Sequence, residues 1–198
     1  MPPRALPLSD DVPQERGDAA RNRTLLLDAA RSLIAERGAD SVTTDDIAVA
    51  AGVGKGTLFR RFGSRAGLMI VLLDEDEKIE QQALMFGPPP LGPGAPPVDR
   101  LIAYGRERLR FVQSHYALLS DANRDPHMRF IAPVMFHHRH IRVLLEAADT
   151  TGDLDAQAFA LLALLDADYV NHELTERGRT LDDLGDAWES VARKLCGQ

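Results

Sequence analysis

The 198-residue sequence contains a single cysteine, Cys196, so no disulfide can form within the chain. One thiol is typical of a protein that works in a reducing compartment. No run of 18 apolar residues is present, so we expect no transmembrane helix. The first residues, Met-Pro-Pro-Arg-Ala-Leu-Pro, lack the apolar core of a signal peptide. These absences together predict a cytoplasmic protein with no membrane partner.

Strand patterns and catalytic motifs are also missing. No segment alternates apolar and polar residues as a half-buried strand does, so we expect an all-α fold. Neither a Gly-x-Ser-x-Gly nucleophile turn nor a Gly-rich phosphate loop occurs in the sequence. The sequence therefore predicts a protein that is not an enzyme and holds no cofactor.

Positive charge is scarce overall but concentrated in one place. The net charge is −7, and most of it comes from residues 73–198, which hold 13 Lys or Arg against 21 Asp or Glu. Residues 1–72 hold 10 basic against 9 acidic residues, and residues 54–65 hold four cations and no anion. A local basic footprint on an acidic chain is typical of a small DNA-reading head joined to a larger body.

This basic segment ends a pattern of two short helices joined by a glycine turn. Thr43 is a candidate N-cap, with Asp46 three residues later as an imperfect capping-box partner. Gly52 ends the first helix, and the second runs from Lys55 to Phe62 with Leu58 facing inward. The pattern predicts a helix-turn-helix whose second helix enters a DNA major groove. An ordinary helical hairpin with a solvated basic face is the alternative.

The residues around this motif carry a family resemblance. They comprise Leu26-Leu27-Asp28-Ala29-Ala30, then Leu33-Ile34-Ala35-Glu36-Arg37-Gly38, then Val42 through Phe62. Over about residues 20–70 the sequence resembles the N-terminal domain of the TetR family of transcriptional regulators. The resemblance implies a three-helix DNA-binding head, a homodimer, and a body whose small ligand controls operator binding.

The resemblance and the outward face of the second helix together predict the DNA contacts. Lys55, Thr57 and Phe59 are expected at base edges. The residues expected at phosphates are Thr44, Arg60, Arg61 and Arg65. The full predicted set is Thr43, Thr44, Lys55, Gly56, Thr57, Phe59, Arg60, Arg61 and Arg65. The sequence departs from the family where Gly54 replaces a capping Ser or Thr, Phe59 replaces Tyr, and Arg61 replaces a common His.

The expected domains follow from helical periodicity and from proline. Residues 1–17 form a disordered tail, 18–64 the DNA-binding domain and 65–198 the helical ligand-binding and dimerisation domain. Within the last, residues 87–97 form a loop because six of them are Pro. The fourth helix should join head to body, with Glu77 and Glu80 solvated on its distal part and Arg108 outward on the next helix. Expected helices span residues 18–37, 65–84, 98–115, 116–122, 125–148, 155–177 and 181–195.

An apolar surface on the last two helices predicts a dimer. Residues 159–165 are apolar on all sides, and the last helix carries a second apolar stripe. Pairing these two helices from each subunit would bury both stripes in a four-helix bundle. The predicted interface comprises Phe159, Leu162, Leu184, Trp188, Val191 and Leu195, and a core within one chain is the alternative.

The middle helices combine aromatic, Met and His side chains, which predicts a pocket for an aromatic or lipophilic ligand. The expected lining comprises Tyr104, Phe111, His115, Met128, Phe130, Met135, Phe136, Tyr169 and His172. The alternative is that these side chains are ordinary core residues. His137 and His140 share a helix face and could bind a metal with Glu173 or Asp166, but neighbouring arginines disfavour a cation. We therefore expect no metal, and keep a metal-dependent enzyme or metal-sensing regulator as the alternative to a repressor released from a palindromic operator.

Overall fold

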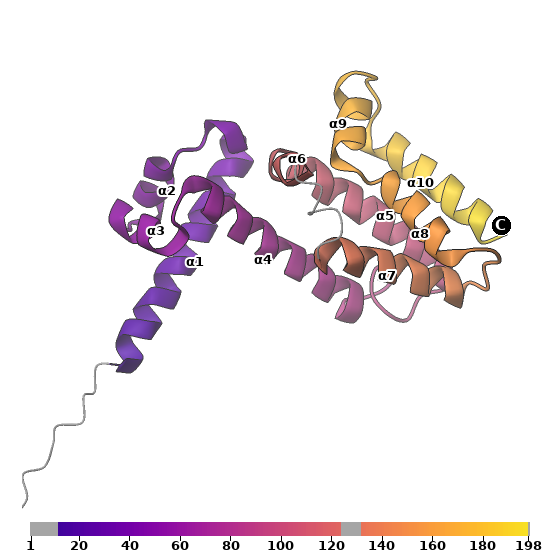
Figure 1. The fold of residues 1–198 in the computed structure, drawn as a ribbon, viewed down its shortest axis with the longest axis horizontal. Coiled ribbons are helices and arrows are strands. Elements are labelled where there is room, and N and C mark those ends of the chain that lie inside the picture. Colours follow the sequence, from indigo (N-terminus) through magenta and orange to yellow (C-terminus); the bar gives the residue numbers. More distant parts are fainter. Residues whose placement is uncertain (1–11, 124–131, 198) are drawn as a thin grey trace, which may run out of the picture. The chain divides into compact units, whose positions relative to one another are not determined.

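The computed structural model describes residues 12–123 and 132–197, and every regular element in these ranges is helical (Figure 1). The predicted all-α fold is confirmed. The chain divides into two compact units, residues 1–72 and 73–198. The division falls within α4 (Arg65–Phe86), so this helix ends the first unit and begins the second.

The first unit is a small helical domain around a single apolar core. Before α4 it contains α1 (Val12–Arg37), the 3₁₀ turn η1 (Ala39–Ser41), α2 (Thr44–Ala51) and α3 (Lys55–Phe62). Its buried apolar residues are Leu26, Leu27, Ala30, Leu33, Val42, Ile47, Ala48, Leu58, Leu68, Met69 and Leu72. Each helix contributes the face that its periodicity predicts.

The start of α1 differs from the expectation. The helix begins at Val12 rather than at a cap on Asp18. Pro13 falls in its first turn, where a missing backbone N–H costs nothing. The expected disordered tail is therefore helical from residue 12 onward, and its first 11 residues lie outside the described part of the chain.

The second unit packs most of its helices against the helix of residues 97–114. After α4 come α5 (Pro97–Ser114), α6 (Tyr116–Asn123), α7 (Ala132–Ala147), α8 (Leu154–Ala163), α9 (Ala167–Thr175) and α10 (Leu181–Leu195). In Figure 1, α10 lies along α5, and α8 lies beside α7. The expected helix from residue 125 begins at Ala132 in the described part, and residues 124–131 lie outside it.

Trp188 of α10 is the largest side chain of this core. It is 1% exposed, and its indole N–H donates a hydrogen bond to the Leu101 carbonyl at 3.0 Å. Gly105 makes this packing possible, because a Cβ at that position would lie 2.1 Å from the indole ring. The prediction that Trp188 lies in a subunit interface is therefore wrong. Leu184 is 4% exposed and belongs to the same intrachain core.

The expected single helix over residues 155–177 is two helices, because a local cap intervenes. The Asp166 carboxylate accepts hydrogen bonds from the N–H groups of Asp168 and Tyr169, each at 3.1 Å. These bonds satisfy donors at the start of α9 and begin a new helix. Within the described residues, no helix is long and apolar enough to cross a bilayer.

Candidate nucleic-acid interface and the buried charged cluster

The start of α2 is fixed by a complete capping box. The Thr43 hydroxyl accepts a hydrogen bond from the N–H of Asp46 at 3.2 Å, and the Asp46 carboxylate accepts one from the N–H of Thr43 at 3.0 Å. The hydrogen bonds from Thr43 lower the pKa of Asp46. Gly52 ends the helix in the left-handed conformation at φ 64°, which glycine adopts at little cost. Thr44 is half-buried in the first turn.

The second helix of the motif, α3, has the bounds that the sequence predicts. Leu58 is fully buried on its inner face, and Phe62 is half-buried. No side chain caps its N-terminus, as Gly54 implies. The exposed face carries four of the predicted contact residues, namely Gly56, Phe59, Arg60 and Arg61. Lys55 is also exposed, and Thr57 is half-buried beside it.

Several residues predicted to contact DNA have partners within the first unit. Lys55 Nζ lies 2.6 Å from a carboxylate oxygen of Asp45, in an ion pair that joins α3 to α2. The same ammonium lies 6.0 Å from the centre of the Phe59 ring. Arg60 donates to the Thr57 hydroxyl at 3.3 Å. Any DNA bound at this face would therefore have to displace or share these contacts.

Arg65 is placed differently from the rest of the predicted set. Its Nε donates to the Val42 carbonyl at 2.8 Å, and its Nη2 donates to the Ala39 carbonyl. The side chain is half-buried and ties the start of α4 to the turn before α2. These bonds make Arg65 a positioning residue for the motif rather than the outward phosphate contact that the sequence suggests.

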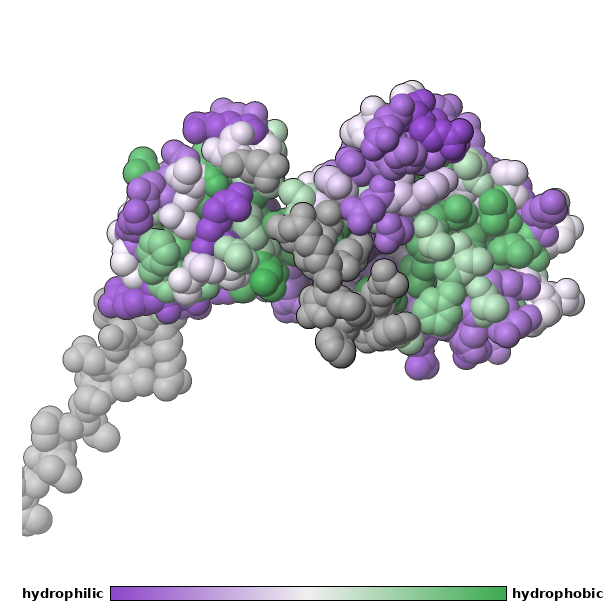
Figure 2. Space-filling view, turned by 45° about the horizontal axis from the view of Figure 1, so that its top comes forward, coloured by the Kyte–Doolittle hydropathy of each residue, from purple (hydrophilic) through white to green (hydrophobic). Residues whose placement is uncertain are grey.

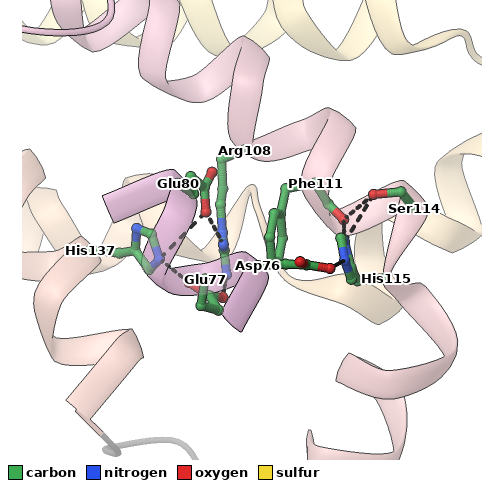
Figure 3. Close-up of polar contacts among 8 residues, drawn as sticks. All are labelled: Asp76, Glu77, Glu80, Arg108, Phe111, Ser114, His115 and His137. Atoms are coloured by element: carbon green, nitrogen blue, oxygen red, sulfur yellow. Dashed lines mark hydrogen bonds and ion pairs between the residues drawn. The ribbon is translucent and has the colours of Figure 1, made fainter. Parts of the chain in front are cut away.

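The second unit contains a buried cluster of charges that the sequence analysis missed (Figure 3). Arg108 of α5 donates to Glu77 at 2.6 Å and to Glu80 at 2.5 Å, both on α4. His137 of α7 lies 3.0 Å from the other Glu77 oxygen. All four side chains are at most 11% exposed, so the expectation that the carboxylates are solvated and Arg108 faces outward is wrong.

A sequence signal for this cluster does exist. Leu68, Leu72 and Leu84 are buried at helical spacing on α4, and Glu80 falls on the same line. A carboxylate that continues an apolar stripe needs a buried cationic partner. Arg108 is that partner, but it lies on a different helix.

Burial and pairing shift the pKa values of Glu77 and Glu80 in opposite directions. Burial alone would raise the pKa of Glu77, but the hydrogen bond from His137 and the charge of Arg108 outweigh it and lower the pKa to about 2. Burial raises the pKa of Glu80, and Arg108 only partly opposes this. Burial and then the charge of Arg108 lower the pKa of His137. At neutral pH His137 is therefore the neutral member of the cluster.

A cavity of about 730 Å³ opens beside this cluster, within the second unit. Arg108, His137, Asp166 and Asp168 form part of its wall, together with apolar side chains of α5, α6, α7 and α8 and the start of α9. Of the predicted pocket residues, only Tyr169 lines it among those the structure describes. Met128 and Phe130 lie outside the described residues.

The other predicted pocket residues lie elsewhere. Tyr104 is fully buried against the rings of His137, His140 and Trp188, and burial raises the pKa of its phenol. The remaining five lie off this cavity: Phe111 and His115 stack on each other, Phe136 packs near His140, and Met135 and His172 are exposed. The prediction named residues of α5, α7 and α9, but mostly other residues of these helices, together with α6 and α8, line the cavity.

The predicted interface residues divide into two groups. Trp188 and Leu184 belong to the chain's own core, whereas Phe159 is 42% and Val191 is 39% exposed. Leu162 and Leu195 are half-buried. On the face shown in Figure 2, hydrophobic side chains of the second unit gather beside hydrophilic ones.

The alternative of a metal bound by His137 and His140 does not fit the positions of the acidic groups. Glu173 pairs with Arg177 at 3.0 Å and Arg179 at 3.1 Å, so it is not available to the histidines. Donor atoms of Glu77, Glu80 and His137 do lie within 4.8 Å of one another. Arg108 bonds both of these carboxylates, and its charge would oppose a cation there.

Comparisons with known proteins agree with the helix-turn-helix geometry. Residues 26–72 match the family model of bacterial regulatory proteins, tetR family. The HTH-type transcriptional regulator AlkX of Mycobacterium tuberculosis is 39% identical over 57 residues, covering 29% of this chain and 27% of AlkX. The HTH-type transcriptional repressor KstR2 of Rhodococcus jostii is 40% identical over 67 residues, covering 34% of this chain and 31% of KstR2. The matched segment thus spans about a third or less of either relative.

The fold comparison extends over most of the chain. A transcriptional regulator from Saccharomonospora viridis, crystallised in complex with choline, superposes with a TM-score of 0.68. It is 21% identical, and the match covers 86% of this chain and 95% of that one. The relatives are transcriptional regulators rather than enzymes. Residues 26–72 therefore carry the N-terminal domain of the tetR family of bacterial regulatory proteins, and the fold of most of the chain resembles that of solved regulators.

Proposed function

We propose that this protein is a sequence-specific DNA-binding repressor that acts in the cytoplasm. The observation that carries the proposal is the exposed face of α3, where Lys55, Phe59, Arg60 and Arg61 stand together on a helix held by a glycine turn. In a helix-turn-helix this face enters the major groove. The name of KstR2 as a repressor supports the sign of regulation.

We further propose that the protein is a homodimer that reads a palindromic operator. One short recognition helix contacts only a few base pairs, and a two-fold dimer doubles the site. The exposed Phe159 and Val191 support an apolar interface on α8 and α10. Trp188 and Leu184 are excluded from that interface by their burial within one chain.

The cavity of the second unit is the proposed effector site. The choline complex of the structural neighbour shows that one regulator of this fold takes a small molecule. In the present chain, Arg108 and His137 line the cavity and also bond Glu77 or Glu80 of α4. A ligand that engages these two groups is coupled through them to α4.

This arrangement supplies a route for induction. The helix α4 is shared along the chain by both units. If the ligand binds one arrangement of α4 more tightly and DNA binds another, each weakens the binding of the other by the same factor. Such coupling is typically about 1–3 kcal/mol.

The proposal is tested with the full chain and DNA from the organism's own genome. Fragments retained by the protein are sequenced, and a candidate operator is assayed by gel shift against scrambled DNA at moderate salt. We expect specific binding at least about a thousandfold tighter than non-specific binding. Ultracentrifugation of the complex gives the stoichiometry. Equal affinity for operator and scrambled DNA would overturn the function, and one chain per site would overturn the dimer.

A further inference from the structure

The polar end of the cavity has one unsatisfied group with a defined chemical character. His137 is 2% exposed and lines the cavity, and its Nδ1 has no hydrogen-bond partner among the described residues. Its Nε2 lies 3.0 Å from Glu77, which is ionised at neutral pH. The carboxylate can only accept, so we assign the ring proton to Nε2. Nδ1 then carries a lone pair and needs a donor.

The charged groups at this end of the cavity are already paired with one another. Arg108 and Glu77 form an ion pair, and Glu80 is the second acceptor of the same guanidinium. Burial raises the pKa of Glu80, so the site resists further negative charge. Burial and the charge of Arg108 lower the pKa of His137, so the site also resists further positive charge. Either charge on a ligand would lose its hydration without gaining a free counter-ion.

The remaining wall is mostly apolar, although Asp166, Asp168 and Tyr169 also line it. The Asp166 carboxylate already accepts hydrogen bonds from two backbone N–H groups at the start of α9. Val112, Leu119, Val134, Leu162 and Leu165 line the cavity around the polar end. Cavities of several hundred Å³ with few polar groups take small molecules that bury most of their surface. The polar groups then fix the orientation of the bound molecule.

We propose that the cavity binds an uncharged, largely apolar alcohol or phenol whose hydroxyl donates a hydrogen bond to Nδ1 of His137. This ligand class refines the proposed effector site and rests on that proposal. Discrimination comes from the buried Nδ1, which an ether leaves unsatisfied.

The test uses two matched series of probes and the full chain. The aromatic series is 4-phenylphenol, 4-methoxybiphenyl, biphenyl-4-carboxylate and biphenyl-4-yl-trimethylammonium. The aliphatic series is octan-1-ol, methyl octyl ether, octanoate and octyltrimethylammonium. Dissociation constants come from calorimetry. In at least one series we expect the hydroxyl compound to bind about tenfold tighter than its methyl ether and than both charged members.

Two variants locate the effect at His137. His137→Phe removes the acceptor, and the preference for hydroxyl over methyl ether should fall to about onefold, whereas the control His140→Phe, on the same helix but off the cavity, should retain it. Glu77→Gln offers an amide N–H to Nε2 while its oxygen still accepts from Arg108. The ring proton should move to Nδ1 and abolish the same preference, with the tautomer read by ¹⁵N NMR.

The experiments distinguish a failure of this inference from a failure of the proposed function. Tightest binding of a carboxylate, an ether or a trimethylammonium in both series overturns the ligand class, as does no binding by any probe. Retention of the hydroxyl preference in both His137→Phe and Glu77→Gln overturns the role of Nδ1. Operator binding is measured separately by gel shift without probe, so its loss or retention speaks only to the proposed function.

Discussion

In the first unit Arg60 and Arg61 are exposed on α3, whereas in the second unit Arg108 is buried between Glu77 and Glu80. An exposed arginine contributes little to folding and remains available to a phosphate. A buried arginine is required by the carboxylates that it neutralises, so its loss affects the fold first. We expect the exposed arginines of α3 to bind a partner and the buried Arg108 to hold the structure, and four predictions test this contrast.

The largest expected effect is on the buried cluster. Arg108→Met would leave Glu77 and Glu80 buried without a cation, which costs about 3–5 kcal/mol of unfolding free energy. The matched control is Arg110→Met on the same helix, where Arg110 pairs with Glu107 at 2.9 Å and both are exposed. Urea unfolding followed by the fluorescence of the single Trp reports the second unit. Equal losses in the two variants would contradict the structural role of Arg108.

The second prediction concerns the pH dependence of the stability of the second unit, which contains the histidines. All six histidines lie in residues 73–198, and burial lowers the pKa of His140 to about 4. Because the folded pKa lies below the unfolded value of 6.5, the unfolded state binds more protons between these pH values. Stability is therefore fully present above pH 6.5 and is lost as pH falls towards 4.

The lowered pKa of His137 acts in the same direction. The loss attributable to His140 is on the order of 3 kcal/mol at most. Urea unfolding monitored by Trp188 at successive pH values measures it, and His140→Phe should reduce the dependence. A pH-independent midpoint of this transition between 6.5 and 4 would show that His140 is not held neutral by the fold.

The sequence was sufficient where local chemistry decides the structure. The bounds of α3 and α10 follow from signals within a few residues, including the Thr180–Asp183 capping box of α10. The same reasoning placed Leu58 on the inner face of α3. It failed for Arg108 and Trp188, since each is buried by a helix distant in sequence. Periodicity shows which face a residue occupies, but not which element covers it.

The third prediction returns to the exposed cations. Arg60→Ala should weaken operator and non-specific DNA by similar factors and reduce the slope of log K against log salt by ~1. The unfolding free energy should change by less than about 0.5 kcal/mol, because the side chain is exposed. Arg110→Ala in the second unit is the control for a lost surface cation. Selective loss of operator binding alone would mean that Arg60 reads bases instead of phosphates.

The smallest effect is expected at the ion pair between Asp45 and Lys55. The pair is exposed and its atoms lie 2.6 Å apart, so it contributes roughly 0–1 kcal/mol and competes with DNA for Lys55. Asp45→Asn should release the ammonium and tighten operator binding about two- to fivefold at low salt. The gain should shrink as salt screens the charges.

Asp46→Asn is the neighbouring control, because it also removes one negative charge near the DNA face but leaves the pair with Lys55 in place. It weakens the capping box and should lower stability without releasing Lys55. Gel shifts at two salt concentrations compare both variants with the parent. If Asp45→Asn binds the operator no more tightly than Asp46→Asn, the pair does not restrain Lys55. Lys55 would then contact DNA independently of Asp45, because no ion pair would have to break before the contact forms.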